Sequence, residues 1–234
     1  MELARDIQYT DILPSKDVAP MSCTHLDSFT YRGANALVDT SSYVSFNPHG
    51  KAGNLVFAGA RAVKQSIGSQ VACKLSLEHF IEGILDYFGG GFSEEDFTEE
   101  EPSLRALEAA FKRANKSVYS FGHSLAAGGR MAAAFIGLVL EDDMIASGRV
   151  GNGSAYLYRA GELFPFFDST GQEEGAHQEG YLGTQSLVSV ELASVATEPH
   201  DVLYVFSQEL SEKEENDLIS LSQEMDFTTA ENPI

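Results

Sequence analysis

Two long helical patterns interrupt a chain that is otherwise patterned for β-strands, and this order restricts the fold more than any other feature. Between residues 63 and 88, and again between 102 and 118, apolar residues recur every three or four positions, as in an amphipathic helix. The glycines at 89–91 end the first pattern, and Pro102, a favoured first-turn residue, begins the second. The strands therefore fall into two groups, one before and one after this helical pair.

The remaining apolar runs are short and are bounded by Gly, Asn, Pro and His. Strands are predicted at residues 26–31, 43–46, 54–59, 132–140, 144–150, 154–159, 163–167, 187–192 and 202–207. Asn152-Gly153 lies between two of these runs and predicts a type I′ hairpin, and the polar residues 168–185 predict a surface loop. Ser211 and Glu214 form a capping box that opens a last helix, to about residue 225. Because strands and helices do not alternate, the pattern predicts an α+β fold rather than a parallel α/β sheet.

The composition restricts the partners. The chain of 234 residues is 43% hydrophobic, which suits one packed domain. Its 35 acidic and 15 basic residues give a net charge of −20, which argues against nucleic acid and against an anionic membrane surface. Cys23 and Cys73 have no metal-ligand spacing, and no signal peptide or membrane-spanning run is present. We expect a soluble, cytoplasmic protein.

Six short segments occur in an order that carries further information. They are Arg32-Gly33-Ala34-Asn35, residues 55–59, 128–131, 150–159 and 205–210, and Glu231-Asn232. Together they resemble the motifs of the metal-dependent Ser/Thr protein phosphatases, the protein phosphatase 2C family. The resemblance implies two antiparallel sheets packed face to face as a β-sandwich flanked by α-helices. It also implies an N-terminal extension and first strand at 1–25, followed by one domain at 26–234.

The resemblance places six positions of the family's metal site in this chain: Ala36, Leu37, Ala58, Asn152, Gln208 and Glu231. Of these, only Glu231 keeps a carboxylate. Ala58 stands where the family has the aspartate that bridges two metals, and Arg61 adds a positive charge nearby. Divalent metals in such sites are held by several oxygens, with carboxylates supplying the charge. The interpretation is a phosphatase 2C fold without a metal cofactor and without catalytic residues, a pseudophosphatase that is not an enzyme.

By family analogy, such a chain is expected to be a regulatory protein-binding module in Ser/Thr phosphosignalling, with a kinase or a phosphoprotein as its partner. Arg32 is either a residual phosphate-binding residue or a salt-bridged strand residue, and the second is favoured. One alternative is a divergent metal-dependent phosphatase with a rebuilt metal site that uses Glu231, Asn152 and loop carboxylates. A second is a serine hydrolase built on Ser124, because residues 122–126 resemble a nucleophile elbow. That elbow requires a strand before the serine, whereas a helical pattern precedes it here.

Overall fold

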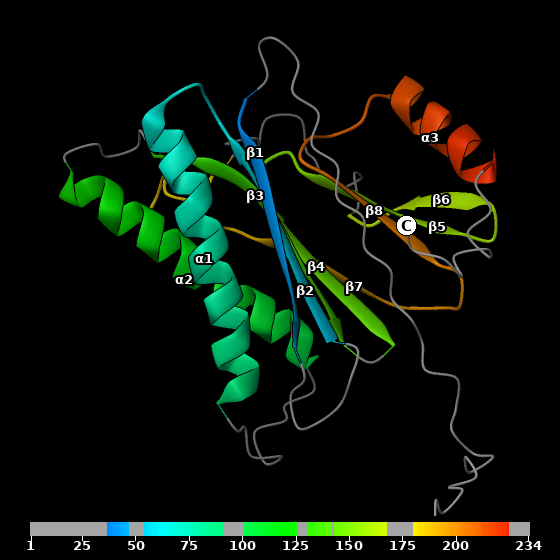
Figure 1. Ribbon diagram of the computed structural model, residues 1–234, viewed down its shortest axis with the longest axis horizontal. Helices are drawn as coiled ribbons and strands as arrows, with labels where there is room; N and C mark the ends of the chain where they lie inside the picture. The colour runs from blue at the N-terminus through cyan, green and yellow to red at the C-terminus, as the bar shows by residue number, and fades with distance from the viewer. Residues whose placement is uncertain are drawn as a thin grey trace, which may run out of the picture.

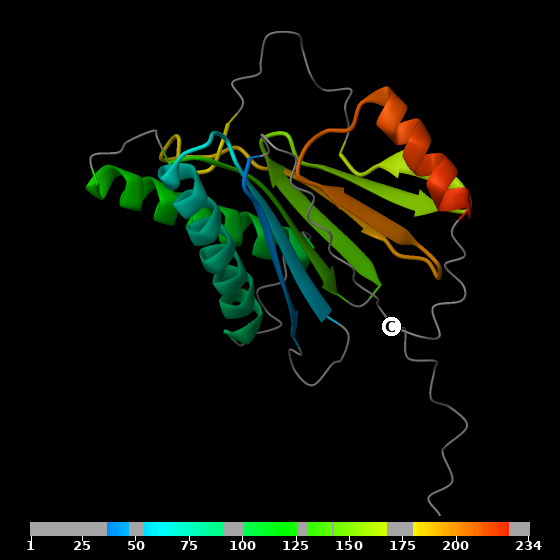
Figure 2. The same cartoon turned by 45° about the horizontal axis from the view of Figure 1, so that its top comes forward.

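The computed structural model describes residues 37–46, 54–90, 101–125, 131–141, 143–167 and 180–224. They form two antiparallel sheets, with a pair of helices on one sheet and a third helix beside the other (Figures 1 and 2). This arrangement confirms the predicted α+β class and the packing of two sheets flanked by helices. The predicted strand at 26–31 lies outside the described residues. No helix in the described part of the chain is long and apolar enough to cross a membrane.

The larger sheet has five strands in the order β1-β2-β3-β4-β7. They are β1 (Asp39–Phe46), β2 (Asn54–Ala62), β3 (Ala133–Glu141), β4 (Met144–Val150) and β7 (Glu191–Ala196). The smaller sheet has the order β6-β5-β8, with β5 (Ser154–Arg159), β6 (Glu162–Pro165) and β8 (Val202–Phe206). The helices are α1 (Ile67–Gly89), α2 (Pro102–Ser124) and α3 (Glu212–Glu224).

The main core lies between the larger sheet and the helices α1 and α2. Three buried aromatic rings meet there, Phe80 of α1, Phe111 of α2 and Phe135 of β3, with ring centroids 5.1–5.4 Å apart. Two strand glycines leave room for them. A Cβ built on Gly137 would come 2.3 Å from the Phe80 ring, and one on Gly148 would come 2.8 Å from Phe111. The helices can therefore approach the sheet closely only where these two strands carry no side chain.

The strands of the larger sheet divide their side chains between two environments. Successive residues of a strand point to opposite faces, and along β2 every second residue from Asn54 to Ala62 is buried. Val56, Ala58 and Ala60 belong to the core on the helix side. The residues between them, including Gly59 and Arg61, therefore face the smaller sheet.

The contact between the two sheets is smaller than the core under the helices. Its buried residues are Ile136, Ala155 and Phe167, with partly buried apolar residues of β7 and β8 around them. Helix α3 is attached to the smaller sheet by polar contacts: the Tyr156 hydroxyl donates to Glu215 at 2.7 Å, and the hydroxyls of Tyr204 and Ser222 lie 2.9 Å apart. Burial, followed by the bond to Glu215, raises the pKa of Tyr156 to about 12.

The predicted capping box of α3 is confirmed. The Ser211 backbone N–H donates to the Glu214 carboxylate at 2.7 Å, and the Glu214 N–H donates to the Ser211 hydroxyl at 3.4 Å. The bonds from Ser211 hold the pKa of the Glu214 carboxyl below its usual value.

The predicted hairpin at Asn152-Gly153 is wrong. Strands β4 and β5 belong to different sheets, so residues 151–153 carry the chain from one sheet to the other. Within this crossover segment the positive φ belongs to Gly151, at +89°, and not to the two residues that follow it. The tight hairpin joins β5 to β6 instead, with φ of 52° at Ala160 and 89° at Gly161. Positive φ at both central residues is the mark of a type I′ turn.

Two further boundaries differ from the prediction. The strand expected at residues 187–192 begins at Glu191 and runs to Ala196. Within the expected surface loop at 168–185, residues 168–179 lie outside the described residues, whereas Leu182 is fully buried and forms a β-bridge with Ala133. Apolar content alone did not show which part of this stretch packs into the core.

We predict that Gly137→Ala lowers the free energy of unfolding by about 2–3 kcal/mol, because the new methyl group overpacks the core against Phe80. The matched control is Gly89→Ala, whose Cβ meets nothing within 4 Å at the end of α1. That substitution should leave stability unchanged or raise it by up to about 1 kcal/mol. Urea denaturation of both variants checks this, and equal destabilisation by the two would contradict the packing.

We predict that Ala160→Asn raises the free energy of unfolding by about 0.5–1 kcal/mol. Alanine in the left-handed region carries a steric cost, and Asn-Gly is the preferred type I′ pair. The gain corresponds to a melting-temperature rise of roughly 1–4 °C in a domain of this size. Ala160→Val is the opposite control and should lower the melting temperature. A melting curve unaffected by either change would show that this turn has another conformation.

Candidate functional site

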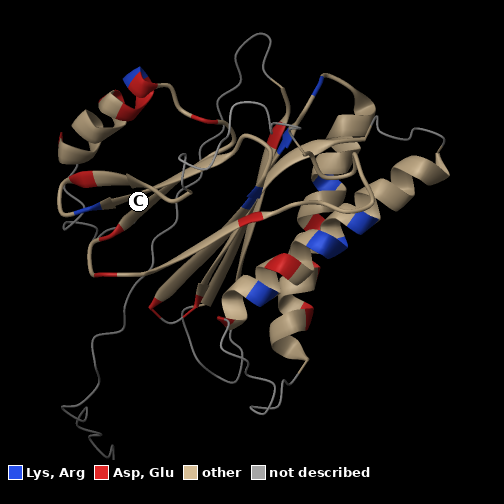
Figure 3. Cartoon of the chain, turned by 180° about the vertical axis from the view of Figure 1, so that it is seen from behind, with Lys and Arg blue, Asp and Glu red and all other residues tan. Residues whose placement is uncertain are grey.

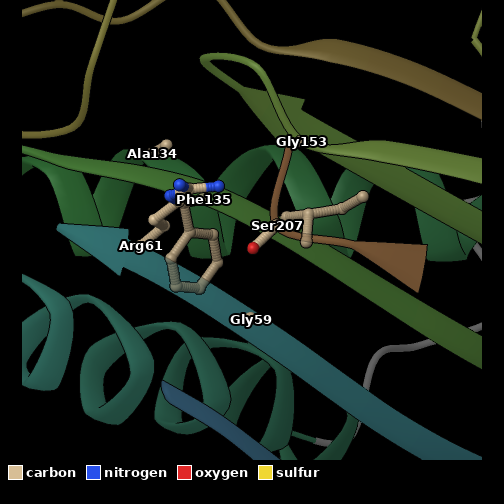
Figure 4. Close-up of a pocket in the computed structure, with 7 residues that line it drawn as sticks. Gly59, Arg61, Ala134, Phe135, Gly153 and Ser207 are labelled. Atoms are coloured by element: carbon tan, nitrogen blue, oxygen red, sulfur yellow. The ribbon is translucent and has the colours of Figure 1, made fainter. Parts of the chain in front are cut away.

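A small pocket lies where the crossover segment and the turn after β8 meet the larger sheet (Figure 4). Its lining residues are Gly59, Arg61, Ala134, Phe135, Ile136, Gly153 and Ser207. They come from β2, from β3, from the crossover segment and from the turn after β8. The pocket is therefore assembled from four segments that are distant in sequence.

Arg61 supplies the positive charge of this pocket. In the strand register it lies opposite Asp39 of β1 on one side and Ala134 of β3 on the other. Its Nη1 donates a hydrogen bond to Oε1 of Gln208, and its Nε lies 3.8 Å from Oδ1 of Asp39. The Arg61 side chain is 21% exposed. It therefore joins the larger sheet to the turn after β8 and keeps contact with solvent.

A second arginine, Arg149 of β4, supports the crossover segment from below the surface. The residue is 8% exposed, and its guanidinium lies 4.7 Å from the Phe167 ring centroid. Its Nε donates to Glu191 at 2.7 Å and its Nη1 to the carbonyl of Gly153 at 3.0 Å, while Glu209 lies 3.7 Å away. Figure 3 marks Lys and Arg in blue, and some of the blue positions lie on strands. Arg149 thus fixes the pocket residue Gly153.

The turn after β8 is also held in place. The Ser154 hydroxyl donates to the backbone carbonyl of Gln208 at 2.9 Å, which fastens this turn to the start of β5. Ser207 lines the pocket, and Figure 4 shows its hydroxyl on the same side as the Arg61 guanidinium. That hydroxyl makes no hydrogen bond to another described residue. The pocket therefore presents a guanidinium and a hydroxyl as donors.

Two of the predicted family-site positions lie at or beside this pocket, and a third lies in the helix-side core. Gln208 contacts Arg61, and Asn152 is exposed in the crossover segment beside Gly153. Leu37 is half-buried against the core on the helix side. Three other predicted positions, Arg32, Ala36 and Glu231, lie outside the described residues, and their roles stay predictions.

The structure does not bring Ala58 to the pocket. Its side chain is fully buried in the helix-side core, on the opposite face of β2 from Arg61. The residue of β2 that meets Gln208 is Arg61, three positions further along and therefore on the other face. Sequence reasoning noted the charge of Arg61 but did not find Asp39 or Arg149. The signal available for Arg149 was a single arginine within an otherwise neutral strand.

The described residues do not fit the metal pair that the resemblance implies. Among them, no group of three or more His, Cys, Asp or Glu residues lies close enough to hold a metal ion. The acids beside the pocket, Asp39 and Glu209, each lie within 4 Å of an arginine. A two-metal centre requires several carboxylates free to coordinate it. The described residues therefore offer no set of ligands for metal chemistry.

The serine hydrolase alternative is wrong. Residues 122–124 form the end of α2 rather than a turn after a strand. The Ser124 hydroxyl donates to the carbonyl of Phe121 at 2.8 Å, and the His123 ring lies 2.9 Å from the carbonyl of Tyr119. Both side chains therefore bond back to their own helix, and the strained elbow that exposes a nucleophile is missing at this position.

No protein-family profile and no curated protein sequence matches the chain. Solved structures do match. The S. agalactiae serine/threonine phosphatase is 19% identical, with a TM-score of 0.50, and the match covers 85% of this chain and 90% of that one. A bacterial serine phosphatase variant is 15% identical, with a TM-score of 0.54, and the match covers 83% and 87%. A stage II sporulation E family protein from Thermanaerovibrio acidaminovorans is 16% identical, with a TM-score of 0.50, over 71% and 79%.

The chain has a phosphatase 2C-like fold. This finding corrects one expectation. The prediction that the chain is not an enzyme is contradicted, because the two reported matches with the greatest coverage of the chain are both phosphatases. That prediction rested on missing acids at single positions, and one of those positions, Ala58, does not reach the pocket at all.

Proposed function

We propose that this chain acts on proteins phosphorylated on serine or threonine, as a phosphatase 2C-like regulatory domain in phosphosignalling. The observation that carries the proposal is the fold, which matches a serine/threonine phosphatase over 85% of this chain. The partner is a phosphoprotein, and the phosphorylated segment enters at the Arg61 pocket.

The charges of the chain support a partner of this kind. Arg61 and Ser207 offer donors to phosphoryl oxygens at the pocket, and guanidinium groups suit such oxygens particularly well. The chain as a whole is acidic, with a net charge of −20. An acidic surface attracts basic partners and repels acidic ones. The preferred segment therefore carries Lys or Arg on either side of the phosphorylated residue.

Hydrolysis of the bound phosphoprotein is the second candidate function. The comparisons favour it, since matched structures of the same fold are phosphatases. The described pocket does not supply the carboxylates of a metal-dependent reaction.

We predict that a phosphothreonine peptide with basic flanks binds at least tenfold more tightly than the same peptide without phosphate. The reason is the added charge-assisted bonding to Arg61. Fluorescence anisotropy measures binding of both peptides, and a phosphate-release assay on the same samples with manganese tests the second candidate. Equal affinity for the two peptides, together with no phosphate release, would contradict an action on phosphoproteins.

A further inference from the structure

Two positions at which the resemblance implies a metal site, Asn152 and Gln208, lie at or beside a pocket that is lined by an arginine, and this disagreement has a chemical consequence. We propose that the Arg61 pocket binds the phosphoryl group directly through the guanidinium, with no metal ion between protein and ligand. The proposal rests on the proposed function and specifies how its ligand is held. Four features of the described pocket support it.

The first feature is the fixed position of the cation. Asp39 lies directly opposite Arg61 on β1, and its Oδ1 atom is 3.8 Å from the Nε atom of Arg61. The Nη1 atom on the other side points across the gap to Gln208. The donors at this end of the guanidinium are therefore directed into the space between the two sheets, where the pocket lies (Figure 4).

The second feature is the nature of the present acceptor. Gln208 offers Arg61 a neutral amide oxygen from an exposed side chain. A phosphoryl group carries the opposite charge and can accept two parallel bonds from one guanidinium, so it is a better acceptor than a single amide oxygen. The turn itself need not move in the exchange, because the Gln208 backbone carbonyl stays bonded to Ser154. A rotation of the Gln208 side chain is enough to free Nη1.

The third feature is the small side chains around the guanidinium. Gly59 and Gly153 line the pocket without side chains, and Ala134 lies directly across from Arg61. A Cβ at Gly153 would come 3.4 Å from both Ile136 and the carbonyl of Phe206, so the inside of the pocket is narrow, and a phosphoryl group meets the guanidinium where Arg61 reaches solvent. Ser207 adds a hydroxyl donor on the same side as the guanidinium.

The fourth feature is the balance of nearby charges. Among the described residues, the acids beside the pocket, Asp39 and Glu209, lie 3.8 and 3.7 Å from an arginine, and Glu191 lies 2.7 Å from Arg149. Pairing reduces their repulsion of a phosphoryl group but does not remove it. Binding of an isolated phosphate is therefore expected to be weak, and the basic flanks of a peptide are needed to strengthen it.

The test uses the full chain and the phosphothreonine peptide with basic flanks, in EDTA and separately with manganese. The affinity should be the same in both buffers within about twofold. Arg61→Ala should weaken binding at least tenfold, and Arg61→Lys should weaken it less, because lysine keeps the charge but loses the two-pronged geometry. The matched control is Arg113→Ala on α2, whose partners are Glu82 and Asp86, outside the pocket. It should bind like the parent.

A second variant tests the proposal if Arg61→Ala does not fold. Gln208→Ala removes the competing acceptor and should leave binding unchanged or tighten it by a few fold. Binding that requires manganese, that survives Arg61→Ala, or that weakens in Gln208→Ala would overturn this inference. In each of those cases the phosphorylated peptide still binds better than its unphosphorylated form, and the proposed function stands. Loss of that preference in the parent chain would defeat the proposed function itself.

Discussion

The fold depends on the packing of two phenylalanines against two glycines. Phe80 of α1 lies over Gly137, and Phe111 of α2 lies over Gly148. A side chain at either glycine position would overlap the phenylalanine ring. This packing sets both helices on one face of the larger sheet. Because that face is sealed, the smaller sheet and the pocket are confined to the other.

This division of faces explains the chemistry of the pocket. A side chain on β2 belongs either to the helix-side core, as Ala58 does, or to the gap between the sheets, as Arg61 does. Charged side chains are not tolerated in the first environment without a partner, whereas the gap offers Gln208, Asp39 and solvent. The guanidinium can therefore occupy the gap at low cost, and it becomes the main electrostatic feature that a ligand meets there.

Much of the fold was predictable from the sequence. The sequence predicted α1 and α2 from their apolar periodicity, α3 from its capping box, and most of the strands, because each of these depends on a local pattern. The sequence did not predict to which of the two sheets each strand belongs. Asn152-Gly153 is a residue pair typical of tight hairpins, but the strands on either side of it belong to different sheets. The tight turn is formed by Ala160-Gly161, although alanine does not favour the positive φ that this turn requires. The prediction that Ala58 belongs to the site failed for the same reason. Whether Ala58 or Arg61 reaches Gln208 depends on strand register and on a contact between residues distant in sequence.

The proposal at stake is that the Arg61 guanidinium, and not a metal ion, meets the phosphoryl group at this pocket. The most direct test is to replace the cation and its acceptor together, by Arg61→Asp with Gln208→Asp, since Asp39 already lies opposite. Three carboxylates would then meet, and manganese should stabilise the folded double variant saturably. At tenfold excess over its dissociation constant, the gain is about 1.4 kcal/mol, or a melting shift of roughly 3–5 °C. The parent chain, measured in about 0.3 M salt with calcium as the control, should show no shift selective for manganese. A selective shift in the parent, or none in the folded double variant, would contradict the claim.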